Sequence, residues 1–80
     1  MQSEYIEKMV DNLPILRAAA SFSQAELAEH VGVSRQTIIA VERKSRPLAW
    51  TLCLAMAFVF SKNKKSRDLM DKLSIFIDFQ

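Results

Sequence analysis

The chain has 80 residues, half of them hydrophobic and a quarter charged, and its formal net charge is +2. This length allows one small domain over residues 1–80, and a composition with one glycine and two prolines excludes a disordered chain and an all-β fold. The single cysteine, Cys53, excludes an intramolecular disulfide. No signal peptide is evident, and the apolar run 48–60 is shorter than the about 20 residues that span a bilayer. We therefore expect a cytoplasmic protein with no membrane partner.

The first quarter of the chain predicts two helices. A short helix over residues 3–10 precedes a second one, which is capped by Asp11 or Asn12 and runs to about Ser21. Pro14 is tolerated in the first turn of that second helix, because its missing N–H would have no partner there.

The only glycine, Gly32, lies between two short helical patterns at about 24–31 and 35–43. Where a helix ends with a residue in the left-handed region, that position favours glycine, because a side chain raises the conformational energy there. Ser34 can then cap the second helix. Helix, tight corner and helix over residues 24–43 are the layout of a helix-turn-helix, whose second helix enters the DNA major groove.

The interior of this segment favours the same interpretation. Ser23 and Glu26 have the spacing of a capping box, which would begin the first of the two helices. Apolar residues occupy the positions where two crossed helices share a core: Leu27, Val31, Val33, Ile38 and Val41.

Two more helices are expected after this segment. Pro47 permits a fourth helix to start, and the apolar run that follows carries it to about Phe60. Ser66 or Arg67 opens a fifth helix, which continues through about Leu73. The predicted fold is therefore all-α and compact, a domain of five helices that follow the short helix over residues 3–10, with a helix-turn-helix in the middle.

Positive charge is concentrated on and after the second helix of the motif. Residues 30–67 contain eight Lys and Arg residues and one acid, Glu42, a net charge of +7. We expect basic side chains in this part of the chain to bind the phosphates of double-stranded DNA. The loop with Lys62, Lys64 and Lys65 follows the fourth helix, and we expect it to be a solubilising loop.

Several short motifs between about Leu13 and Lys62 resemble the Cro and lambda-repressor class of helix-turn-helix domains, the xenobiotic-response-element-like regulators. They are Leu-Arg in the first helix, Ser-Gln-Ala-Glu-Leu-Ala, Val-Gly-Val-Ser-Arg-Gln-Thr-Ile and Val-Glu-Arg, with Trp50 opening the fourth helix. The chain differs from the family at Lys44, where relatives usually have Gly, and on the outer side of the fourth helix, which is apolar here.

The resemblance and the chemistry of the side chains together select the candidate DNA-binding residues. Arg35 can bridge O6 and N7 of guanine, Gln36 can bridge N6 and N7 of adenine, and Thr37 can touch a thymine methyl group or a phosphate. In the family, the residue at Gln24 clamps a phosphate. The full set of candidates is Gln24, Ser34, Arg35, Gln36, Thr37, Arg43, Lys44 and Arg46. The resemblance also implies a structural ion pair between Arg17 and Glu42.

The apolar fourth helix predicts a homodimer. We expect Trp50, Cys53, Leu54 and Ala57 to face the core, which leaves apolar side chains on other faces, and a helix that is apolar all round must be covered on all sides. The C-terminal segment, about 66–79, adds more apolar surface, and residues 75–79 fit either a helix or an extended arm. The residues predicted to form the interface are Phe58, Leu73, Phe76 and Ile77.

The chain lacks the residues of an enzyme: it has no paired acid and base, no phosphate-binding glycine loop and no metal motif. We expect no cofactor, no metal and no small-molecule ligand. The predicted function is a sequence-specific transcriptional regulator, a repressor that acts by occupying DNA. The alternative is a protein-interaction or antitoxin-like module on the same fold with little DNA binding.

Overall fold

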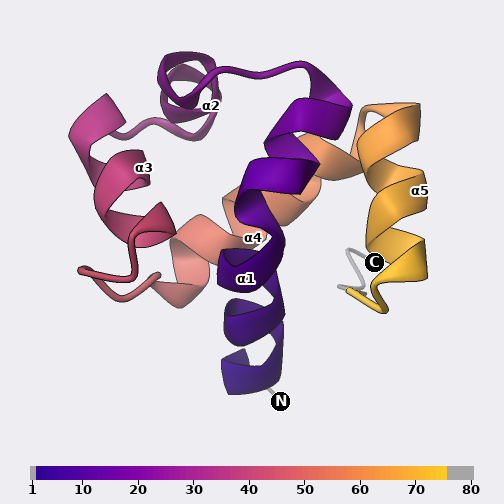
Figure 1. Cartoon of the computed structure of the whole chain (residues 1–80), viewed down its shortest axis with the longest axis horizontal. Coiled ribbons are helices and arrows are strands. Elements are labelled where there is room, and N and C mark those ends of the chain that lie inside the picture. Colours follow the sequence, from indigo (N-terminus) through magenta and orange to yellow (C-terminus); the bar gives the residue numbers. More distant parts are fainter. Residues whose placement is uncertain (1, 76–80) are drawn as a thin grey trace.

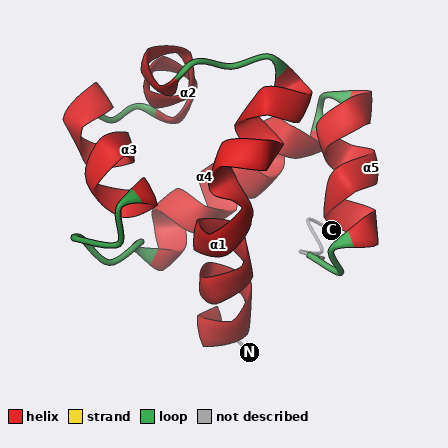
Figure 2. Ribbon diagram, in the orientation of Figure 1, coloured by secondary structure: helices red, strands yellow, loops and turns green. Residues whose placement is uncertain are grey.

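The computed structural model describes residues 2–75, which form helices and connecting loops without a strand (Figure 2). The five helices are α1 (Gln2–Ala20), α2 (Gln24–Val31), α3 (Arg35–Glu42), α4 (Trp50–Ser61) and α5 (Lys64–Lys72). In Figure 1, α1 and α4 cross at the centre, with α2 and α3 on one side and α5 on the other. The predicted all-α fold with five helices is confirmed.

Helix α1 is continuous, so the helix boundary predicted at Asp11 or Asn12 is wrong. Asn12 lies inside the helix, where its side-chain amide donates a hydrogen bond to the Lys8 carbonyl (2.8 Å). Pro14 interrupts the backbone hydrogen bonds of α1, and a proline inside a helix typically lowers the stability of that helix by about 3 kcal/mol. The apolar stripe nevertheless continues across the proline, and its burial offsets this cost. The stripe consists of Met9, Leu13, Leu16 and Ala20.

Helices α2 and α3 begin and end close to their predicted bounds, because local chemistry determines their ends. Ser23 and Glu26 form the complete capping box at the start of α2. Gly32 ends α2 in the left-handed region with φ +77°, and the Ser34 hydroxyl accepts a hydrogen bond from the Thr37 N–H (3.2 Å) at the start of α3.

Of the last two helices, one starts where the family resemblance implies and the other does not. Helix α4 begins at Trp50, the residue that the resemblance places at its start, after Pro47. Helix α5 begins at Lys64, earlier than predicted, because the Asn63 side chain caps it by accepting from the Ser66 N–H (3.1 Å). Ser66 is therefore inside the helix and buried, where its hydroxyl donates to the Phe60 carbonyl (2.6 Å).

Three further helix ends adopt positive φ without glycine. Ser21, Lys44 and Ser74 have φ values of +62°, +61° and +58°. At each corner, as at Gly32, the next N–H donates to the carbonyl five residues earlier, the hydrogen bond of a Schellman motif. The four bonds are Phe22 to Arg17 (2.8 Å), Val33 to Ala28 (3.0 Å), Ser45 to Ala40 (3.0 Å) and Ile75 to Met70 (2.9 Å).

Helix α4 is the centre of the core and packs against α1, α2 and α5. Its buried residues are Cys53, Met56, Ala57 and Phe60. The prediction was right for Cys53 and Ala57, but Leu54 and Trp50 are only partly buried. Three neighbouring helices account for much of the apolar character of α4.

Candidate nucleic-acid interface

The exposed start of α3 presents two polar side chains that could read DNA. Arg35 and Gln36 are exposed, and within residues 2–75 neither side chain has a hydrogen bond or an ion pair. The hydroxyl groups of Ser34 and Thr37, in contrast, are 3.0 Å apart and hydrogen-bonded to each other. This hydrogen bond and the Ser34 cap stabilise the first turn of α3, which carries the two exposed side chains.

Behind this turn, a network of polar side chains ties α3 to α1 and α2. The Arg17 guanidinium donates to both oxygens of Glu42, from Nε to Oε2 (2.6 Å) and from Nη2 to Oε1 (3.2 Å). Its Nη1 donates to the Phe22 carbonyl (3.0 Å), and the Gln24 amide donates to Glu42 Oε1 (2.9 Å). The Arg17 and Glu42 side chains are 17% and 9% exposed. The structure therefore contains the expected ion pair, and it adds a hydrogen bond to Gln24 that the sequence analysis missed.

The loop after α3 carries three basic side chains with different surroundings. Lys44 lies against α1, with its Nζ 2.7 Å from Asp11 Oδ1, and both side chains are largely exposed. The hydrogen bond and charge of Asp11 raise the pKa of Lys44. Arg43 and Arg46 are exposed and have no ion pair among the described residues.

The predicted interface residues are only partly described. Phe58 is 48% exposed on α4, and Leu73 is half-buried against the core. Phe76 and Ile77 lie outside the described residues.

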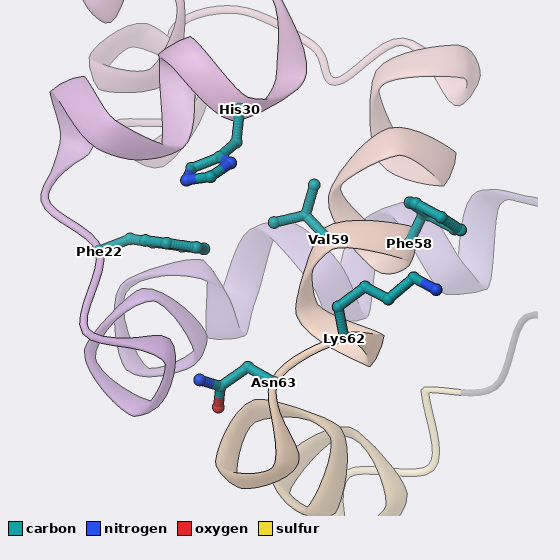
Figure 3. A pocket seen from close by; sticks show the side chains of 6 residues that line it. All are labelled: Phe22, His30, Phe58, Val59, Lys62 and Asn63. Carbon is teal, nitrogen blue, oxygen red and sulfur yellow. The ribbon is translucent and has the colours of Figure 1, made fainter.

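A surface groove of about 490 Å³ lies beside Phe58, and Figure 3 shows its lining. The His30 ring packs against Phe22 with 4.6 Å between centroids, and Lys62 Nζ lies 4.8 Å from the centre of the Phe58 ring. His30 thus has a packing role that the sequence analysis did not anticipate. No lining residue comes from α3, so the groove is separate from the candidate interface. The lining residues are Phe22, His30, Phe58, Val59, Lys62 and Asn63.

Cys53 is buried in α4, and this burial raises the pKa of its thiol to about 11. The thiol is therefore protonated at neutral pH and behaves as a small apolar group. In the described part of the chain, no group of His, Cys, Asp and Glu side chains could hold a metal ion. No helix within residues 2–75 is long and apolar enough to cross a membrane.

The paired short helices, the left-handed corner and the exposed first turn of α3 define a DNA-binding helix-turn-helix regulator. Residues 15–53 match the family model described as Helix-turn-helix, and this segment is a helix-turn-helix domain of the Cro and lambda-repressor type. No curated protein and no solved structure is significantly similar to the chain.

Proposed function

We propose that the protein is a sequence-specific repressor that inserts α3 into the major groove of double-stranded DNA. The observation that carries this proposal is the first turn of α3, where Arg35 and Gln36 are exposed and have no partner within residues 2–75. Both side chains can make bidentate hydrogen bonds to base edges, Arg35 to guanine and Gln36 to adenine. Repression follows from occupancy, because a protein bound over a promoter blocks other proteins there.

Phosphate contacts set the register of α3 on the DNA. Gln24 begins α2, where free N–H groups and the positive end of the helix dipole suit an anion. The other candidates border α3 on both sides: Ser34, Thr37, Arg43, Lys44 and Arg46. For Lys44, binding a phosphate would require it to leave Asp11, so we expect its contribution to be smaller than that of Arg43 or Arg46.

The protein acts as a homodimer in this proposal, through Phe58, Leu73, Phe76 and Ile77. A two-fold dimer would place two α3 helices about 34 Å apart, which matches successive major grooves on a palindromic site. Sedimentation equilibrium at micromolar concentration tests the oligomeric state. A monomer that binds one half-site would contradict the dimer but not the DNA binding.

Selection from a random DNA library, followed by mobility-shift assays on the enriched sites, tests the main proposal. We expect one enriched sequence and a much weaker affinity for unrelated DNA. Failure to enrich any sequence would contradict the proposal and favour a protein-interaction module on the same fold.

A further inference from the structure

The Glu42 carboxylate joins the scaffold of the domain to its proposed DNA contact. Glu42 is the last residue of α3, and Gln24, 18 positions earlier, is the first residue of α2. Their side chains meet at Glu42 Oε1, which accepts from both Gln24 Nε2 (2.9 Å) and Arg17 Nη2 (3.2 Å).

The chemistry of a carboxylate determines how the Gln24 amide is oriented. An ionised Glu accepts hydrogen bonds but donates none, so Gln24 must turn its NH₂ group, not its carbonyl, toward Glu42. One N–H of the amide is used in this way, and the second N–H remains to donate to another acceptor. A phosphate oxygen at the start of α2 is such an acceptor.

The Gln24 bond is not needed to satisfy the ion pair. Arg17 already donates to both oxygens of Glu42 and to the Phe22 carbonyl. Gln24 is half-buried and could turn to water without leaving a buried group unpaired. The bond therefore has a consequence for Gln24 itself, because it restricts the side chain to one orientation before DNA arrives.

We infer that Glu42, held in place by Arg17, is a positioning residue that pre-orients the Gln24 amide toward a DNA phosphate. This inference rests on the proposed function. Ordering one such side chain before binding corresponds to a gain in affinity of about three- to tenfold.

Two matched double variants test the inference on the full chain. Arg17→Met with Glu42→Gln removes the ion pair but keeps an oxygen that can accept from Gln24. The new amide can also donate to the Gln24 carbonyl, so it holds the side chain but fixes its orientation less strictly than the carboxylate does. Arg17→Met with Glu42→Met removes the same ion pair and also the oxygen. Both variants have the net charge of the wild type, and neither leaves a charge unpaired in the network. They therefore differ mainly in whether Gln24 is held.

We expect the variant with Glu42→Gln to bind the enriched DNA site about three- to tenfold more tightly than the variant with Glu42→Met. Adding Gln24→Ala to both should abolish this difference. Equal dissociation constants in the presence of Gln24, or a difference that persists in its absence, would overturn the inference alone. A wild type that binds no DNA sequence would overturn the proposed function as well.

Circular dichroism melts establish that each variant is folded at the assay temperature. Should a double variant fail to fold, NMR of the wild type provides an independent test. The side-chain ¹⁵N–¹H signals of Gln24, assigned by their loss in Gln24→Ala, should show a slowly exchanging proton and a single side-chain rotamer in the free protein. Rotamer averaging with rapid exchange would overturn the inference.

Discussion

Replacing Arg17 with alanine should destabilise the domain more than any other single loss of charge on its surface. The substitution removes three hydrogen bonds, two to the Glu42 carboxylate and one to the Phe22 carbonyl. Glu42, whose side chain is 9% exposed, keeps only the hydrogen bond from Gln24. Breaking a buried ion pair in this way costs about 3–5 kcal/mol. Because the Arg17 side chain is itself 17% exposed and water can reach the site, we expect a value near the lower end, about 3 kcal/mol.

Thermal and urea denaturation measure this loss. For a domain of this size, about 3 kcal/mol corresponds to a fall in Tm of roughly 12–24 °C. Arg35→Ala is the matched control, because it removes the same side chain from an exposed site without an ion pair, and its effect should stay within about 0.5 kcal/mol. If Arg17→Ala and Arg35→Ala changed the free energy of unfolding equally, the network would contribute no more than an exposed ion pair, and the reasoning would fail.

Four substitutions test the interface and the helix ends. Arg35→Ala and Gln36→Ala should each cost about 1–3 kcal/mol of binding to the preferred DNA site and relax the preference at particular base pairs; an equal loss on random DNA would show phosphate contacts only. Gly32→Val should lower stability by about 1–2 kcal/mol from the backbone strain of positive φ, because a Cβ at this position meets no atom within 4 Å and adds no clash. An unchanged urea midpoint would contradict this. Lys44→Gly should raise stability by about 0.5–1 kcal/mol, because it relieves the strain of positive φ at the expense of an exposed ion pair. A lower urea midpoint for Lys44→Gly would show that the contact with Asp11 outweighs the strain.

Features that depend on neighbouring residues in the chain could be predicted from the sequence. The capping box of Ser23 and Glu26, the corner at Gly32 and the cap at Ser34 each involve residues within five positions of one another. Such local chemistry determines helix ends before any tertiary contact forms. The bounds of α2 and α3 were therefore predicted to within one residue.

Features that depend on distant contacts could not be derived in the same way. Pro14 and the polar pair before it indicate a break in α1, but the apolar stripe on both sides of Pro14 is buried against other helices and keeps the helix continuous. A lysine does not by itself indicate positive φ, so the conformation of Lys44 could not be predicted from its residue type. The glycine that the family usually has at this position indicates that a left-handed residue is needed there. The hydrogen bond from Gln24 to Glu42 joins residues 18 positions apart and became visible only in the packed structure.

The packing of α4 against other helices leaves less apolar surface for a homodimer than its sequence suggests. An apolar α4 on its own suggests a large surface awaiting a partner. In the folded chain α1, α2 and α5 cover α4 on several sides, so Met56 and Phe60, which face the core, lend no support to a second copy. The support that remains on the described surface is Phe58, 48% exposed beside the groove, together with the half-buried Leu73. Phe58→Lys is therefore a sharper test of the dimer than truncation of the C-terminal segment, because it adds a charge at an exposed position and leaves the core intact. The variant should sediment more as a monomer than the wild type only if this face of α4 contacts a second copy.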